Sequence, residues 1–303
     1  MQNVQFKIIF RGWLKNKTYT LISLISLITG ITCCTLLVTF VIHEYNIAHS
    51  ILNSKNSYLV QEQREQDATP SEALISGKSG VQLKNTYPEV KAYCVLRNEH
   101  LFLSEESKES DYMYAYSVTP SFTEFFKLPL LSGDLHKTLL SSNEIAVTRS
   151  FALQYFGIVN PIGKSITLGH SIRHFDGKEN TYKTIFKSHT ITTVIDDSQK
   201  SFLHYGILRG LSDEEVSQIT GFSFYTFIEL TPEVTVQKFL AKINDRNEGQ
   251  FEDKTIYLKP AKELYFSKTR HLYERGLIFK RDPSFVYLGM GVAILIFIIA
   301  CFN

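Results

Sequence analysis

The chain has 303 residues, with 32 Lys and Arg side chains against 30 Asp and Glu. This length allows one large or two modest domains, and the near balance of charge gives no reason to expect nucleic acid as a partner. The charges are unevenly placed: residues 1–17 carry four bases and no acid, whereas 18–42 and 283–303 carry no charged side chain. The pattern predicts a soluble body, residues 43–282, between two apolar ends.

Residues 1–17 have the pattern of a cytoplasmic amphipathic helix that lies on a membrane surface. Four apolar side chains have the i, i+3, i+4, i+7 spacing of one helical face: Phe6, Ile9, Phe10 and Trp13. The bases expected to anchor the helix on the cytoplasmic side are Arg11, Lys15 and Lys17. Ile8 breaks the pattern, and a general membrane-targeting signal explains the same composition. The functional interpretation is that residues 1–17 form a helix that a cytoplasmic partner pushes to move the membrane helices. We call this predicted helix the lever.

Residues 18–42 form an uncharged run of 25 residues. A helix needs about 20 such residues, each rising about 1.5 Å, to cross the bilayer core, and it pairs its backbone polar groups internally. A cleaved signal peptide fits less well, because the run is too long and no small-x-small cleavage site followed by a polar stretch is evident. We therefore predict a first transmembrane helix at 18–42.

Residues 283–303 form the second predicted transmembrane helix, with 18 strongly apolar residues from Phe285 to Phe302. Gly289 and Ala293 have the small-xxx-small spacing that permits close helix packing. The sequence stops one residue after Phe302, and this ending predicts a truncated polypeptide.

The basic N-terminus sets the expected orientation. The positive-inside rule puts the N-terminus in the cytoplasm and residues 43–282 on the far side of the membrane. Lys280 and Arg281, next to the second run, favour the opposite orientation. The first span is given more weight, because it usually dominates and long loops translocate largely regardless of charge.

The body alternates strand and helix signals and predicts a mixed α+β domain. Strands are expected at Tyr112–Val118, Glu144–Thr148, Ile191–Ile195, Phe222–Leu230 and Thr255–Leu258. Helices are expected after the capping-box pair Ser212 and Glu215, from Thr231–Pro232 through Phe239 and Ile243, and from Thr148 to Phe156 with Gly157 as the stop. The polar, glycine-bounded stretch Gly169–Asn180 predicts a surface loop.

The segment Gly157–Ser165, GIVNPIGKS, approaches the pattern of a phosphate-binding loop but departs from it. Five residues rather than four separate its two glycines, and Pro161 removes an amide needed to cradle phosphate. The segment instead predicts a turn between the helix ending at Phe156 and a strand from Ser165 to Leu168.

Other reactive side chains form no catalytic or metal-binding pattern. His170 and His174 have a chelating spacing, but they lie in the predicted loop without a nearby cysteine. Asp196 and Asp197 are adjacent and would point to opposite sides of a strand, which suits paired acid–base work poorly. Cys94 is the lone cysteine of the body and predicts a core residue rather than a disulfide. We predict no catalytic residue, cofactor or metal, and hence no enzyme.

Four segments spread over the whole chain carry longer motifs. They are Phe10–Leu27 (FRGWLKNKTYTLISLISL), Thr119–Asp134 (TPSFTEFFKLPLLSGD), Glu144–Lys164 (EIAVTRSFALQYFGIVNPIGK) and Ala300–Asn303 (ACFN). In order and spacing they resemble the MacB/FtsX-like permeases of ABC transporters, in particular the long bacteroidete type. Two positions depart from the family pattern: Thr119 stands where Asp is usual, and Arg149 where Glu is common.

The resemblance implies a porter-and-sabre type periplasmic domain between the first two of at least four membrane helices. It implies a location in the bacterial inner membrane, membrane lipid as surroundings, a homodimer or paired permease, and a separate cytoplasmic ABC-type ATPase as partner. The implied function is to transmit ATP-driven motion to the periplasmic domain, for export or mechanotransmission. In the family, the chain continues past ACFN and the P-I-G-K motif is a structural turn.

Two alternatives come from other classes of protein. A membrane-anchored periplasmic sensor or signal-transducing receptor has the same order of helix, periplasmic domain and helix. A sensor would continue into a cytoplasmic signalling module, whereas a permease would continue into a further membrane helix. A membrane-anchored hydrolase would need a catalytic constellation that the sequence does not offer.

Overall fold

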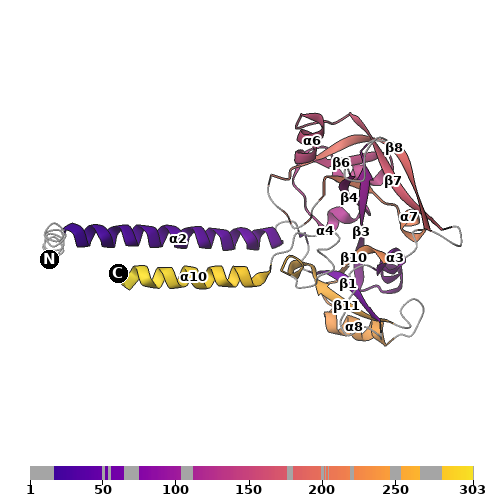
Figure 1. Ribbon diagram of the computed structural model, residues 1–303. Helices are drawn as coiled ribbons and strands as arrows, with labels where there is room; N and C mark the ends of the chain where they lie inside the picture. The colour runs from indigo at the N-terminus through magenta and orange to yellow at the C-terminus, as the bar shows by residue number, and fades with distance from the viewer. Residues whose placement is uncertain are drawn as a thin grey trace. The chain divides into compact units, whose positions relative to one another are not determined.

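The computed structural model describes residues 17–49, 52–53, 56–64, 75–103, 112–175, 180–198, 201, 203, 205–218, 222–245, 254–266 and 282–302. The chain divides into two compact units (Figure 1). One unit comprises residues 1–46 and 281–303, and the other comprises residues 47–280.

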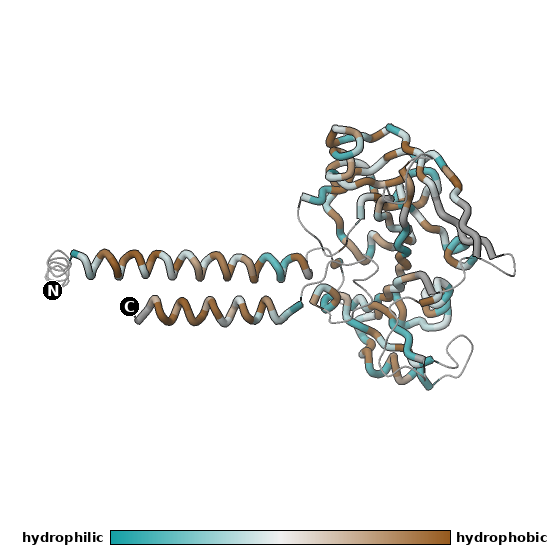
Figure 2. The backbone as a smooth tube through the Cα atoms, in the orientation of Figure 1, coloured by the Kyte–Doolittle hydropathy of each residue, from teal (hydrophilic) through white to brown (hydrophobic). Residues whose placement is uncertain are grey.

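The first unit contains two long helices, α2 (Lys17–His49) and α10 (Pro283–Phe302). By length and composition, both are apolar enough to cross a membrane. Figure 2 shows apolar residues along most of both helices. Helix α2 continues beyond the uncharged run, through His43 and Glu44, and its last turn belongs to the second unit.

Within the described residues, the second unit is built on one 11-stranded sheet. The strand order is β11-β1-β10-β3-β4-β9-β6-β8-β5, with β2 paired to β10 and β7 paired to β3 and β8. The strands are β1 (Ser57–Arg64), β2 (Ile75–Ser76), β3 (Val90–Phe102), β4 (Tyr112–Val118), β5 (Leu130–Ser132), β6 (Glu144–Thr148), β7 (Ser165–Phe175), β8 (Asn180–Ile195), β9 (Ile207–Gly210), β10 (Phe222–Leu230) and β11 (Lys254–Pro260).

The sheet is mixed and mostly antiparallel, which fits the predicted mixed α+β domain. Strand β4 pairs with β9 in parallel, and β6 pairs with β8 in parallel, whereas the other named pairs are antiparallel. Short helices lie along the sheet: α3 (Gly77–Thr86), α4 (Phe122–Phe125), α5 (Leu135–Leu140), α6 (Arg149–Phe156), α7 (Asp213–Gln218), α8 (Val236–Asn244) and the 3-10 helix η2 (Ala261–Glu263).

Strand β10 lies inside the domain and is covered on both faces. All five residues from Phe224 to Ile228 are buried, which explains why this strand is almost continuously apolar. Tyr225 and Phe227 join one core cluster, whereas Thr226 lies against Gly80 of α3 on the other face. A side chain at residue 80 would meet Thr226 at 2.9 Å, so the glycine permits the close approach of α3.

The strand predictions are confirmed. Tyr112–Val118, Glu144–Thr148 and Phe222–Leu230 are β4, β6 and β10 with the expected bounds. Residues 191–195 are the end of β8, and residues 255–258 lie inside β11.

The predicted ends of two helices are also confirmed. Thr148 caps α6 by accepting the amide of Phe151 at 3.2 Å, and Gly157 ends that helix in the left-handed region at φ 69°. At α7, the amide of Ser212 donates to Glu215 at 2.9 Å, and the amide of Glu215 donates to Ser212 Oγ at 3.2 Å. These reciprocal bonds are the capping box that the sequence predicts.

The start predicted for α8 is wrong. Thr231 and Pro232 lie in a turn, closed by the bond from the amide of Val234 to the carbonyl of Thr231 at 3.2 Å. The helix begins at Val236, after Thr235 in extended conformation. The amphipathic face at 236, 239, 240 and 243 packs on the sheet, so burial of that face sets the start rather than the threonine–proline pair.

The surface loop predicted at Gly169–Asn180 is also wrong. Strands β7 and β8 pair through this stretch, from Ser165 opposite Thr190 to Phe175 opposite Asn180. Main-chain pairing defines the strand there, so its polar composition misled the prediction. Gly169 contributes directly, because a side chain at that position would meet the Phe186 ring of β8 at 2.6 Å.

Candidate functional site

The predicted membrane-surface lever lies almost wholly outside the described residues. This holds for Phe6, Ile9, Phe10, Arg11, Trp13 and Lys15. Lys17 is the first residue of α2 and is exposed. It lies next to the apolar body of α2, as a base that anchors a helix at a membrane interface does.

Helices α2 and α10 come close to each other at two small residues, Gly30 and Ala300. A Cβ atom on Gly30 would lie 2.8 Å from the Cβ atom of Ala300, so the glycine allows this separation. Of the two residues predicted to pack, Ala293 is 4% exposed, whereas a Cβ atom on Gly289 would meet nothing within 4 Å. The small-residue contact of the described chain is therefore centred on Gly30 and Ala300.

Next to this contact, a groove of about 270 Å³ lies between the two helices. Its lining is aliphatic and aromatic apart from one thiol: Cys34, Leu37, Val38, Val41, Ile42, Met290, Ala293, Ile294 and Phe297. The groove offers no charged or hydroxyl group, so it suits hydrocarbon surroundings and not a polar solute.

The end of α2 enters the core of the second unit. Ile47 is 6% exposed and belongs to one buried cluster with Phe122, Phe125 and Phe126. The segment that follows α2 is also held by a main-chain hydrogen bond, because the amide of Asn53 donates to the carbonyl of Phe125 at 2.9 Å. The Asn53 side chain also donates to the carbonyl of Glu124 at 3.0 Å. The α2 connection is thus fixed to α4.

Two residues that follow η2 pack in the same cluster. After η2, Leu264 and Tyr265 are 1% and 5% exposed and pack in the cluster with Ile47 and the three phenylalanines. We name this set, Ile47, Phe122, Phe125, Phe126, Leu264 and Tyr265, the junction cluster. Phe126 links it to the sheet through an edge-to-face contact with Phe227 of β10, with ring centroids 5.3 Å apart.

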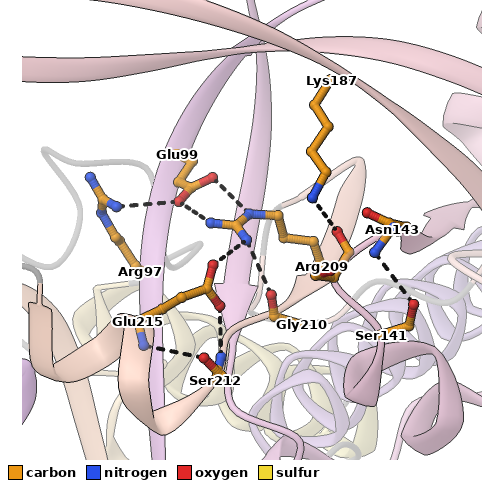
Figure 3. A network of polar contacts seen from close by, with 10 residues as sticks. Arg97, Glu99, Ser141, Asn143, Lys187, Arg209, Gly210, Ser212 and Glu215 are labelled. Atoms are coloured by element: carbon orange, nitrogen blue, oxygen red, sulfur yellow. Dashed lines mark hydrogen bonds and ion pairs between the residues drawn. The ribbon is translucent and has the colours of Figure 1, made fainter.

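A second feature is a set of ion pairs on one face of the sheet (Figure 3). Arg209 of β9 donates from Nε to Glu99 Oε2 at 3.3 Å and from Nη2 to Glu99 Oε1 at 3.1 Å. Arg97 reaches the same carboxylate at 3.4 Å, and Glu215 of α7 lies 3.7 Å from Arg209 Nη1. We name Arg97, Glu99, Arg209 and Glu215 the charge network.

The strand register explains how the charge network forms. Arg97 of β3 lies opposite Ser117 of β4, which lies opposite Arg209 of β9. The guanidinium of Arg209 therefore reaches across β4 to β3, and the small side chain at Ser117 leaves room for it. Burial opposes the charged form of Arg209, but Glu99 and Glu215 together raise its pKa above the ordinary value.

Sequence reasoning missed most of this network. Of its four residues, only Glu215 carried a local signal, as the partner of Ser212 in a capping box. Arg97 and Glu99 have the i, i+2 spacing of one strand face, but β3 was not among the predicted strands. Arg209 is 110 positions from Glu99, so only the sheet topology brings them together.

The segment from Gly157 to Lys164 is a structural turn, as predicted. The amide of Gly163, at φ 84°, donates to the carbonyl of Ile191 at 2.9 Å. The amide of Lys164 donates to the carbonyl of Pro161 at 3.0 Å. Because these amides are bonded within the protein, they do not form a phosphate cradle, and the turn leads into β7 at Ser165.

The side chains of His170 and His174 lie outside the described residues, and among those that are described no three His, Cys, Asp or Glu gather as metal ligands. Asp196 and Asp197 follow β8 rather than lying in a strand, which corrects the prediction. They do bind separate partners: Asp196 accepts the amide of Ser198, and Asp197 accepts the amide of Ser150, both at 3.0 Å. The bond from Ser198 lowers the pKa of Asp196.

A search of curated protein sequences finds no match. The chain is similar in structure to a domain of a putative permease from Porphyromonas gingivalis, at 15% identity and a TM-score of 0.48, covering 68% of this chain and 90% of that one. It is also similar to the periplasmic region of MacB from Actinobacillus actinomycetemcomitans, at 12% identity and a TM-score of 0.44, covering 69% and 90%.

A family model supplies the assignment. The model of the MacB-like periplasmic core domain matches residues 20–246, which is more than half of the chain. The match includes the segments around Thr119–Asp134 and Glu144–Lys164 on which the resemblance rests. The chain belongs to the family of the MacB-like periplasmic core domain, a component of transporter permeases.

Proposed function

We propose that the chain serves as a permease subunit of an ABC transporter, in which ATP hydrolysis by a separate cytoplasmic ATPase changes the conformation of the periplasmic domain. The family supports a transporter component. The observation that carries the coupling is the junction cluster, because the end of α2 and the residues that follow η2, Leu264 and Tyr265, are held in one buried core. Movement of either connection would be transmitted to the same packed side chains.

The proposal includes the topology derived from the sequence. Residues 1–17 lie on the cytoplasmic surface of the inner membrane, 18–42 and 283–303 span it, and 43–282 form the periplasmic domain, of porter-and-sabre type. The mean apolar character of α2 and α10 supports the two spans. The subunit would act as a homodimer or a paired permease within membrane lipid.

Cysteine accessibility tests this topology. In a background without Cys33, Cys34 and Cys301, Lys137→Cys places a thiol on a side chain that is 81% exposed. A membrane-impermeant maleimide added to intact spheroplasts should label this variant. The Lys17→Cys variant should be labelled only after the membrane is opened. Labelling with the opposite pattern would disprove the topology and, with it, the proposed function.

Coupling to the ATPase is tested with the full chain, co-expressed with its cognate ATPase. Charge reversal by Arg11→Glu and Lys15→Glu should weaken capture of the ATPase and uncouple its activity, because the basic face of the lever is lost. The double variant Lys137→Glu with Lys238→Glu, which changes two exposed bases of the periplasmic domain by the same total charge, is the control. Unchanged binding and coupling in the first variant, with membrane insertion intact, would exclude the lever.

A further inference from the structure

The two edges of the sheet are finished in different ways. At the β11 edge, the side chain of Asn244 donates to the carbonyl of Ile256 at 3.1 Å and accepts the amide of Ile256 at 2.9 Å. It thus satisfies both main-chain groups of that residue. Pro260, at the end of the strand, has no amide hydrogen to offer. Part of this edge is therefore blocked against pairing with a further strand.

Strand β5 forms the opposite edge, and among the described residues it pairs only with β8. Leu130 and Leu131 are 41% and 44% exposed, although successive side chains of a strand point to opposite faces. Strand β5 has only three residues and offers few outward main-chain groups, so a partner strand would depend largely on contact with these exposed apolar side chains.

The conformation of β5 is fixed at both ends. Before it, the amide of Asp196 donates to the carbonyl of Pro129 at 2.8 Å. After it, Gly133 has φ 90°, and a Cβ atom there would lie 2.3 Å from the Thr192 carbonyl oxygen. Asp134 then caps α5 by accepting the amide of Lys137 at 3.1 Å. A segment held in this way needs little further ordering to bind a partner.

The turn from Gly157 to Lys164 extends the apolar surface. Ser132 Oγ donates to Asn160 Oδ1 at 3.3 Å, which ties the turn to the end of β5. The turn exposes three aliphatic side chains by 39–42%: Ile158, Val159 and Ile162. Of the ten exposed large apolar or tyrosine side chains described in residues 47–280, eight lie between 130 and 162. We name Leu130, Leu131, Ile158, Val159 and Ile162 the edge patch.

The charges around the edge patch favour one kind of partner. Lys127 precedes β5 and Lys164 ends the turn, and both are exposed. Among the described residues, neither lysine has an acidic partner within ion-pair distance. Lys164 lies 5.3 Å from the centre of the Phe156 ring, which holds its charge near the patch. The acids next to β5 are already bonded, since Asp134 pairs with Lys137 at 3.7 Å and Asp196 accepts the amide of Ser198. The two unpaired bases therefore complement an apolar segment with acidic ends.

We propose that β5 and the edge patch form a docking site for an extended segment of a partner polypeptide, apolar in its middle and acidic at its ends, which adds to the sheet as a further strand. Main-chain bonds to β5 would give this segment its orientation, and the edge patch would cover its apolar side chains. The site does not depend on the proposed transport function, since it uses only features of residues 127–164.

The test uses the purified full chain in detergent and a fluorescent nine-residue peptide with alternating valine and threonine between terminal glutamates. Two further peptides carry N-methyl groups on alternate amides. One of them loses the hydrogen-bond donors along one edge of the extended peptide, and the other loses the donors along the opposite edge. The parent peptide should bind, and one N-methylated peptide should bind at least about tenfold more weakly while the other retains affinity, because only one edge pairs with β5.

Leu131→Lys should also weaken binding at least about tenfold, because it places a charge on the edge strand. Leu140→Lys is the matched control, since Leu140 is 65% exposed on α5 and lies outside the edge patch. Circular dichroism melting should show that both variants fold. A double reversal, Lys127→Glu with Lys164→Glu, should transfer the preference to a peptide with terminal lysines.

Four outcomes would overturn the proposal. They are no binding up to about 1 mM peptide, equal affinity for the two N-methylated peptides, equal effects of the Leu131 and Leu140 changes, and unchanged charge preference in the double reversal. If Leu131→Lys instead abolishes self-association of the chain, the edge belongs to a second copy. If it instead abolishes flotation with anionic vesicles, the edge belongs to lipid. Either result replaces the proposed occupant.

Discussion

In the junction cluster, Phe122, Phe125 and Phe126 are each at most 1% exposed, and the contacts are between apolar side chains. In the charge network, the side chains of Arg209 and Glu99 are 13% and 9% exposed, and the contacts are between charges. The stability of the junction cluster depends on close packing, because removing a buried side chain leaves a cavity. The stability of the charge network depends on ion pairing, because removing one partner leaves the other as an unpaired buried charge.

The junction cluster and the charge network stabilise the domain by different kinds of contact. The junction cluster packs the end of α2 against α4 and against the two residues that follow η2, through dense contacts between apolar side chains. The charge network holds α7 to the sheet and fixes the orientation of Arg209 through several directed bonds. We therefore expect the two regions to respond differently to the loss of one side chain and to the loss of its partner.

Phe125→Ala should have the largest effect, a loss of about 3–5 kcal/mol in the free energy of unfolding, because a fully buried ring is removed and its surroundings collapse only in part. Urea unfolding of the full chain in detergent, followed by circular dichroism, measures this loss. Leu140→Ala removes a side chain that is 65% exposed and should change stability by no more than about 0.5 kcal/mol. Similar losses in the two variants would contradict the role given to the junction cluster.

Arg209→Met should cost less, about 2–4 kcal/mol, because it leaves Glu99 buried with Arg97 as its remaining base. Adding Glu99→Leu should restore a large part of the loss, since the unpaired buried carboxylate is then gone as well. Arg97 is 30% exposed and can turn to water. A double variant as unstable as the single one would show that packing, rather than charge, holds this region.

The parts of the fold that the sequence predicts are those with local signals. Strand β4 is rich in aromatic and β-branched residues, and α6 has Thr148 before it and Gly157 after it. The β7–β8 pairing could not be predicted, because its polar stretch carries no apolar alternation and main-chain bonds define it. The junction cluster was also beyond reach, since Ile47 and Leu264 come from opposite ends of the domain and only the fold unites them.

Thr119 is a buried polar residue beside the apolar junction cluster, so its substitution tests hydrogen bonding and packing at one position. Its hydroxyl accepts the amide of Val95 at 3.1 Å, and its carbonyl accepts the amide of Phe122 at 2.9 Å. The departure from the family's usual Asp therefore still leaves an acceptor for Val95. Thr119→Val should cost about 1–3 kcal/mol, because the buried amide loses its partner.

Thr119→Ser is the matched control, since it keeps the hydroxyl and removes one methyl group. Its cost should be about 1 kcal/mol or less, measured by the same urea unfolding. If Val and Ser are equally destabilising, the methyl group rather than the hydroxyl is what the site requires.

The smallest expected change in stability concerns the ion pair of Glu89 and Lys242, which lies at the surface of the domain. The bond from the Lys242 side chain lowers the pKa of Glu89 below its ordinary value. A carboxyl whose pKa is lowered on folding stabilises the protein above its unfolded pKa and loses that contribution as the pH falls through the folded pKa. Lys242 is 44% exposed, so solvent screening limits the contribution to about 0.2–1 kcal/mol at neutral pH.

The measurement compares wild type with Glu89→Gln at a series of pH values. The difference in unfolding free energy should favour wild type at pH 7, shrink as Glu89 becomes protonated in acid, and shrink also in high salt. The matched difference for Phe125→Ala should stay large through the same series, because the ring carries no charge. A Glu89→Gln difference that is independent of both acid and salt would mean that packing of the side chain, and not its charge, supports this contact.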